Sequence, residues 1–149
     1  MTDRIRIGVV GTGSLGFHHA RILREVEGVE MVGIHEHDAA RADEVARELG
    51  VVAHAALDGL LEHADAVVVA VPTVAHEEVA TQALARGVHT LIEKPMAPDL
   101  AAADRILAAA EQVAALLDDC GSERVEEAAP GQFHREGLGA PGLVQMIGC

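Results

Sequence analysis

Short apolar runs alternate with amphipathic stretches through most of this sequence. Five of the runs are predicted to be strands, at Ile5–Val10, Val29–Ile34, Val51–His54, Ala66–Val71 and Val88–Ile92. Apolar runs of this length are typical of strands that are buried on both faces of a parallel sheet. The run at 66–71, with four valines and no charge, is the strongest of the five, and the run at 51–54 is the weakest.

Helical spacing of apolar residues fills the intervals between these strands. A first helix ends near Gly28, and a second begins at an N-capping Asp38 and stops at Gly50. Further helices are predicted at 57–62, at 76–86 and from Pro98 and Asp99 onward. The residues expected to face the core are Leu15, His19, Ile22 and Val26 in the first helix, Ala42, Val45, Ala46 and Leu49 in the second, and Leu100, Ala103, Leu107 and Ala110 in the last.

The alternation of strand and helix predicts an α/β fold, a doubly wound parallel sheet of the Rossmann type with right-handed crossovers. At 149 residues the chain has the length of one domain. We expect this domain to span residues 1–117 and residues 118–149 to form an irregular tail. Ligands of such sheets bind at the carboxyl ends of the strands, so the chemistry is expected just after residues 10, 34, 71 and 92.

Composition narrows the classes of function. Half of the residues are hydrophobic but only 1% are aromatic, so the core is expected to consist of Ala, Val, Leu and Ile. The formal net charge of −13 argues against binding to nucleic acid or to an anionic membrane surface. No signal peptide or membrane span is recognisable, and the spacing of Cys120 and Cys149 fits no disulfide framework, which favours the cytoplasm. The nine histidines are scattered without an HExxH motif, so no metal site is expected.

The first candidate site is the segment Gly11-Thr12-Gly13-Ser14-Leu15-Gly16, between the first predicted strand and the first predicted helix. Gly11 permits a tight turn, Gly13 lets the backbone approach a pyrophosphate, and Gly16 allows the helix to pack closely on the strand. The helix N-terminus at Ser14 and Leu15 presents free N–H groups to the phosphates. In this strand–turn–helix context the motif predicts dinucleotide binding.

Glu36 follows the second predicted strand, twenty residues after Gly16. A carboxylate at this place can accept hydrogen bonds from the ribose hydroxyls of adenosine and would repel a 2′-phosphate, which favours NAD over NADP. The alternative is a solvated loop acid, because His35, His37 and Asp38 crowd the same turn. A neighbouring histidine could also offset the repulsion of a phosphate, which keeps NADP as the second choice.

The stretch from Val67 to Met96, VVVAVPTVAHEEVATQALARGVHTLIEKPM, narrows the kind of Rossmann domain. It contains three blocks: Val71-Pro72-Thr73, then His76 with Ala80, Ala83, Leu84 and Gly87 behind it, and finally Glu93-Lys94-Pro95. In this order and spacing the blocks resemble the Gfo/Idh/MocA oxidoreductase family, and with the glycine loop the resemblance covers about residues 4 to 115. An S-adenosylmethionine methyltransferase would share the glycine loop and the acid but has no use for the Glu-Lys-Pro block.

The resemblance implies roles for several of these residues. Pro72 and Thr73 would line the cofactor groove, and Glu93 and Lys94 would lie near the nicotinamide and the substrate. A lysine at the carboxyl end of a central strand can stabilise charge on a substrate oxygen during hydride transfer, so Lys94 is the candidate catalytic residue. The alternative for Glu93 and Lys94 is a surface ion pair.

Two histidines also match family positions. His76 matches a position near the cofactor, with a structural role at the start of a helix as the equal alternative. His19 is expected to pack on the apolar face of the first helix.

The resemblance stops after the last predicted helix. A complete family member continues with a strand that carries a Gly-His pair and then with a second α+β domain, which supplies the substrate pocket, the oligomer interface and an acid/base histidine. Residues 114–122 lack that pattern, and residues 136–145 only faintly resemble the entry into the second domain. That domain is therefore expected to be essentially missing, because of truncation, because the chain is a fragment, or because another chain supplies it. Apolar surface left uncovered would favour association into a homo-oligomer.

The sequence thus predicts the NAD-binding module of an oxidoreductase that transfers a hydride to or from a carbinol carbon of a sugar or nucleotide sugar. Within the family, Leu15–Arg21 and Pro72–His76 look most like enzymes that oxidise nucleotide-linked amino sugars such as UDP-N-acetylglucosamine. The competing hypothesis is a non-enzymatic dinucleotide-binding remnant.

Overall fold

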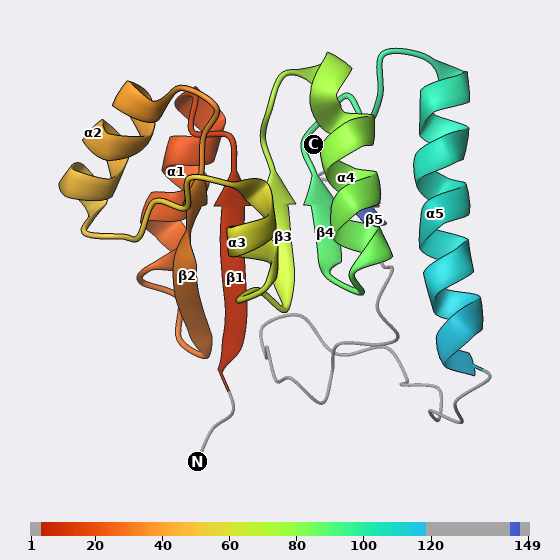
Figure 1. Ribbon diagram of the computed structural model, residues 1–149, viewed down its shortest axis with the longest axis horizontal. Coiled ribbons are helices and arrows are strands. Elements are labelled where there is room, and N and C mark those ends of the chain that lie inside the picture. The colour runs from red at the N-terminus through yellow and green to blue at the C-terminus, as the bar shows by residue number, and fades with distance from the viewer. Residues whose placement is uncertain (1–3, 119–143, 147–149) are drawn as a thin grey trace.

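The computed structural model describes residues 4–118 and 144–146, which form one parallel sheet between two layers of helices (Figure 1). The strands are β1 (Ile5–Val10), β2 (Val29–His35), β3 (Ala66–Val69), β4 (His89–Ile92) and β5 (Val144–Met146), in the order β2-β1-β3-β4-β5. The helices are α1 (Ser14–Leu23), α2 (Ala39–Leu49), α3 (Leu57–Leu61), α4 (His76–Ala85) and α5 (Leu100–Asp118), with a 3-10 turn η1 (Thr73–Ala75) before α4. All four strand pairings are parallel, so the predicted doubly wound α/β fold is confirmed.

Each face of the sheet has its own apolar core. Alternate residues of β3 serve the two cores, because successive side chains of a strand point to opposite faces. Val67 and Val69 pack with α3, α4 and α5, and Val68 packs with α1 and α2. The largest fully buried apolar side chains are Ile5, Ile34, Leu60, Leu84, Ile92 and Ile106 together with valines, as the composition predicts.

The predicted strand at 51–54 is wrong as a strand. This segment contacts the outer edge of β2 through one parallel bridge, in which Ile34 donates to Val52 and accepts from His54, both at 2.8 Å. The ladder ends there because β2 has a bulge: the register with β1 shifts by one residue at Val32. The Val32 carbonyl oxygen contacts the His54 ring, Nε2 to O at 3.1 Å, where a further strand residue would otherwise bind.

The prediction of an irregular tail from residue 118 is wrong for residues 144–146, which form β5. This strand pairs with β4 from Thr90 to Ile92. Of its three residues, Val144 is β-branched and favours a strand. Asp118 ends α5, and residues 119–143 and 147–149 lie outside the described residues.

The capping predictions for α2 and α5 are confirmed, but α1 ends at Leu23, before the predicted stop at Gly28. The Asp38 side chain accepts hydrogen bonds from the backbone of Ala40 and Arg41, and Gly50 ends α2 in the left-handed conformation. Asp99 caps α5 through the amide of Ala102 at 2.8 Å.

The predicted core face of α2 is confirmed at Ala42, Val45 and Leu49 and that of the last helix only at Ala110, whereas that of the first helix is wrong. In α1 the buried residues are Gly16 and Ala20, whereas Leu15 and Ile22 are about half exposed, and the helix ends before Val26. In α5 the buried residues are Ala102, Ile106 and Ala110, whereas Leu100 and Leu107 are exposed. In α1 the small residues Gly16 and Ala20 let the helix approach the sheet closely, so their face packs on the core. In α5 the large residue that is buried is Ile106 and not the predicted Leu107. Within the described ranges, no helix is both long and apolar enough to cross a membrane.

Candidate dinucleotide-binding site

Two glycines of the loop between β1 and α1 stand where a Cβ would clash with the backbone. Gly11 has a positive φ of 85°, and a Cβ there would lie 2.8 Å from the backbone of Ala70, the residue after β3. A Cβ on Gly16 would lie 1.8 Å from the carbonyl oxygen of Gly11, so this residue fixes the contact between helix and loop. Gly13 differs, because a Cβ there would meet nothing within 4 Å. Its openness leaves the N-terminus of α1 accessible to a ligand.

An open groove of about 1000 Å³ lies over this loop at the carboxyl ends of β1, β2 and β3. Six of the predicted cofactor residues line it: Gly11, Gly13, Ser14, Leu15, Glu36 and Pro72. The walls also include Leu57 of α3 and Glu78, Val79 and Gln82 of α4, which no sequence motif marked. The groove therefore runs from the glycine loop to the loops after β2 and β3, where the strand order predicts a ligand.

Glu36 is tied to the glycine loop. Its Oε2 accepts hydrogen bonds from the backbone N–H of Thr12 at 2.7 Å and from the Thr12 hydroxyl at 3.1 Å, and its Oε1 accepts from the amide of Asp38 at 3.2 Å. Burial acts to raise the pKa of Glu36, but these hydrogen bonds outweigh it and hold the pKa below its ordinary value. A carboxylate with a lowered pKa is an ionised acceptor at neutral pH.

Thr12 and Arg41 belong to this site and were missed from the sequence. Thr12 is fully buried, and its carbonyl oxygen accepts a hydrogen bond from Arg41 Nε at 3.1 Å. The guanidinium of Arg41 also lies 5.7 Å from the centre of the Phe17 ring and pairs with Glu44. Thr12 was missed because its position between the glycines can hold many residue types in this motif. Arg41 was missed because it is one of several basic residues predicted on helix surfaces.

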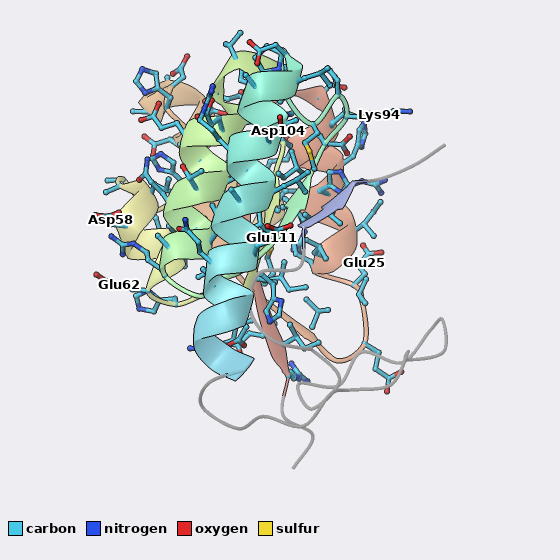
Figure 2. The ribbon with its side chains drawn as sticks, turned by 90° about the vertical axis from the view of Figure 1, so that its right-hand side faces the viewer. Glu25, Asp58, Glu62, Lys94, Asp104 and Glu111 are labelled. Atoms are coloured by element: carbon cyan, nitrogen blue, oxygen red, sulfur yellow. The ribbon has the colours of Figure 1, made fainter. Side chains whose placement is uncertain are left out.

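Five of the predicted site residues do not line the groove: Gly16, Thr73, His76, Glu93 and Lys94. Thr73 begins η1 beside Pro72. Lys94 is exposed and follows β4, and Figure 2 shows it pointing outward at the end of the molecule where the strands of the sheet terminate. The Lys94–Pro95 peptide bond is cis.

His76 is buried, only 1% exposed. Its Nδ1 lies 3.1 Å from the carbonyl oxygen of Met96, and its Nε2 lies 2.9 Å from that of Val71. Both ring nitrogens thus face the protein backbone.

Glu93 is buried at the end of β4, and its carboxylate contacts His19, with Nε2 and Oε1 separated by 2.6 Å. The expectation that His19 only packs is therefore incomplete, because His19 also binds Glu93. The two residues are 74 positions apart in the sequence, so no local pattern indicated this contact. The backbone amide of Lys94 also donates to Glu93 Oε2, at 3.3 Å.

The donor set fits a dinucleotide better than a metal. No group of three or more His, Cys, Asp or Glu side chains could hold a metal ion anywhere in residues 4–118 and 144–146. The groove instead combines an accessible helix N-terminus, which favours phosphates, with one ionised acceptor that suits ribose hydroxyls.

Fold and groove together define a dinucleotide-binding domain of the Rossmann class. The family model described as an oxidoreductase family with an NAD-binding Rossmann fold matches residues 5–117. The chain belongs to this family, the Gfo/Idh/MocA oxidoreductases, and the resemblance stated from its sequence blocks is confirmed.

Individual relatives agree with this assignment. The chain is 38% identical to UDP-N-acetylglucosamine 3-dehydrogenase of Acidithiobacillus ferrooxidans over 92% of its own length and 43% of the relative's. It is 35% identical to inositol 2-dehydrogenase of an Arthrobacter species, over 91% and 42% of the two chains. The chain therefore spans less than half the length of these curated relatives.

Solved structures give the same picture. A structure of the Acidithiobacillus ferrooxidans enzyme superposes with a TM-score of 0.69 at 39% identity, covering 73% of this chain and 35% of that one. GenD2 from gentamicin A biosynthesis, solved in complex with NAD, superposes with a TM-score of 0.69 at 32% identity, covering 75% and 33%.

Proposed function

We propose that this chain is the cofactor-binding domain of an NAD-dependent dehydrogenase that acts on a sugar or nucleotide sugar. The observation that carries the proposal is the continuous groove that joins the N-terminus of α1 to Glu36. A dinucleotide needs both features, a cradle for its pyrophosphate and an acceptor for its ribose hydroxyls.

Different residues would contact different parts of the cofactor. The pyrophosphate would lie against the backbone of Gly11, Gly13, Ser14 and Leu15, where the N–H groups and the positive end of the helix dipole point into the groove. The adenosine ribose would lie on Glu36, and Pro72 with Thr73 would border the path toward the nicotinamide. Gly16 contributes by closing the helix onto the loop.

NAD is proposed over NADP because of Glu36. Its hydrogen bonds hold it ionised, and an ionised carboxylate repels the 2′-phosphate of NADP. Arg41, which could attract a phosphate, already binds the Thr12 carbonyl oxygen and Glu44.

Bound NAD would accept a hydride from a carbinol carbon of the substrate, or its reduced form would return one to the carbonyl. Lys94 is proposed as the catalytic residue that hydrogen-bonds the substrate oxygen and stabilises its developing negative charge. Support comes from its place after β4, at the carboxyl ends of the strands, and from family membership.

We place the protein in the cytoplasm on the basis of its cysteine usage.

The relatives suggest the substrate class. Their names specify UDP-N-acetylglucosamine, inositol and glucose 6-phosphate, all of them polyhydroxylated rings. A second candidate function is dinucleotide binding without turnover, which the same groove would support.

A thermal melt of the full chain with increasing NAD, repeated with NADP, tests the proposal. A ligand that binds only the folded state stabilises it by about 2.7 kcal/mol at a hundredfold excess over Kd, which is a shift of about 5–10 °C for a chain of this size. We expect such a shift with NAD, a smaller one with NADP, and a reduced NAD shift in Glu36→Ala. A cooperative melt that neither nucleotide moves would overturn the proposal. NADH formation with UDP-N-acetylglucosamine or inositol then separates the dehydrogenase from the non-enzymatic binder.

A further inference from the structure

The segment Glu93–Met96 leaves the sheet immediately after β4. Its last ladder bond runs from the Glu93 amide to the carbonyl oxygen of Val69 on β3, at 3.0 Å. Beyond this bond Lys94 and Pro95 are exposed, so the sheet itself does not fix their position.

One contact that holds this segment comes from α1. The Glu93 carboxylate is only 7% exposed, and its Oε1 lies 2.6 Å from His19 Nε2. The contact between this carboxylate oxygen and Nε2 is a hydrogen bond, in which we assign Nε2–H of His19 as the donor. Because leaving a buried carboxylate oxygen without a donor is costly, this bond ties the start of the segment to the helix that carries the glycine loop.

The other contact comes from α4. His76 lies with Nδ1 3.1 Å from the Met96 carbonyl oxygen and Nε2 2.9 Å from the Val71 carbonyl oxygen. Carbonyl oxygens only accept, so the buried ring donates to at least one of them and bridges the end of the segment to the loop after β3. Val71 itself lines the cofactor groove.

We infer that His19 and His76 are positioning residues that clamp the Glu93–Met96 segment from two helices and thereby set the place of Lys94 after the carboxyl end of β4. His76 has no ring nitrogen left for a cofactor, and Nε2 of His19 is committed to Glu93. The importance of Lys94's place rests on the proposed function, whereas the clamp itself does not.

Backbone amide exchange of the full chain without nucleotide tests the His19 contact. In His19→Leu, exchange at Lys94, Met96 and Ala97 is expected to rise at least about tenfold, the effect of losing roughly one hydrogen bond locally. Exchange at Val68 and Val69 of the core should stay unchanged. His19→Gln, whose amide N–H can take the place of Nε2–H, should restore protection, and the adjacent exposed histidine in His18→Gln serves as the control.

The His76 contact is tested first without a variant, because a fully buried ring tolerates few substitutions. Ring nitrogen NMR shifts should show His19 with its proton on Nε2 and His76 with at least one hydrogen-bonded N–H. The variants His76→Asn and His76→Gln then separate the two contacts: the Asn amide reaches the place of Nδ1 and should keep Met96 and Ala97 protected, and the Gln amide reaches that of Nε2 and should not.

Two outcomes would overturn the inference. One is equal protection of Lys94, Met96 and Ala97 in wild type and His19→Leu, and the other is a uniform loss of protection that includes the core and that His19→Gln does not repair. A parallel NAD titration keeps the two proposals apart. If NAD fails to bind wild type while the clamp variants behave as expected, the proposed function fails and the clamp stands.

Discussion

The carboxylate of Glu36 and the backbone amide of Thr12 lie 2.7 Å apart, which joins the acid after β2 to the glycine loop after β1. The Thr12 hydroxyl reinforces the contact at 3.1 Å, and Arg41 holds the Thr12 carbonyl from the other side. Two loops that a dinucleotide would contact at the same time are therefore fixed relative to one another by the protein alone. A site arranged in advance lowers the entropic cost of binding.

Replacing Glu36 with glutamine should change cofactor choice more than it changes the fold. The amide oxygen can still accept from Thr12, but the negative charge that repels a 2′-phosphate is gone. We expect NAD affinity to fall about tenfold, equal to about 1.4 kcal/mol, and the preference for NAD over NADP to shrink. Calorimetric titration of both nucleotides measures this, with Glu48→Gln, an exposed acid of α2, as the charge-matched control. Unaltered affinities for both nucleotides in Glu36→Gln would remove Glu36 from the ribose site.

The same residue should make stability depend on pH in the acid range. Burial alone would raise the pKa of Glu36, but hydrogen bonds led by that from Thr12 lower it below the ordinary value of 4.5. A carboxyl with a lowered pKa in the folded state contributes stability above its unfolded pKa and loses it as pH falls through the folded pKa. The melting temperatures of wild type and Glu36→Gln should therefore converge below pH 4.5. Melting curves recorded at about pH 6 to 3 test this, and a constant difference between the two proteins would contradict it.

Local signals predicted much of this molecule correctly, because the physics behind them is local. Gly11 and Gly16 stand where a Cβ would clash with the backbone, and Gly13 stands where the backbone is open to a ligand. Asp38 caps the start of α2 by hydrogen bonding, and Gly50 ends it in the left-handed conformation. These features depend on residues within a few positions of one another.

The errors occurred where distant contacts decide the structure. The ring of His54 binds the bulged Val32 carbonyl, which no periodicity of the segment 51–54 could indicate. His19 looked like a packing residue because its partner Glu93 is remote in sequence. In α1 the larger apolar residues were assigned to the core, but close approach to the sheet selected the face with Gly16 and Ala20. In α5 the predicted Leu107 is exposed and the neighbouring Ile106 is buried.

Gly13 and Gly16 of the loop should respond differently to an added methyl group. In Gly16→Ala the new Cβ would lie 1.8 Å from the Gly11 carbonyl oxygen, so helix and loop must separate at a cost of about 2–3 kcal/mol. In Gly13→Ala the Cβ meets no protein atom, so the cost should stay within about 1 kcal/mol, the usual effect at a helix N-cap. The same Cβ lies at the groove and should weaken NAD binding. Denaturant unfolding together with NAD titration measures both effects, and a loss of stability in Gly13→Ala equal to that in Gly16→Ala would refute the assignment.

The corrected core face of α5 has its own test. Ile106 is fully buried against α4 and the sheet, so Ile106→Ala should cost about 2–4 kcal/mol. Leu107, the next residue, is 44% exposed, so Leu107→Ala should cost less than about 1 kcal/mol. Urea unfolding of both variants compares the two faces directly. If Leu107→Ala proved the more damaging change, the face first predicted from the sequence would be the correct one.

A second dependence of stability on pH should come from His89, at the start of β4. Burial lowers the pKa of His89 below the ordinary value of 6.5, and the charge of Asp65 opposes the shift only in part. Among the described residues, its buried Nδ1 has no hydrogen-bond partner, so the folded state offers no acceptor to the proton it would gain there. The unfolded chain therefore binds this proton at a higher pH than the folded one.

Stability should consequently fall as pH drops below 6.5, before the Glu36 contribution changes. His89→Gln removes this titration while keeping a polar side chain, so its melting temperature should decline less than that of wild type between about pH 7 and 5. His18→Gln, which removes an exposed histidine, should follow the wild-type curve. If the His89→Gln and wild-type curves run parallel through this range, the acid sensitivity comes from other groups and the buried ring of His89 does not resist protonation.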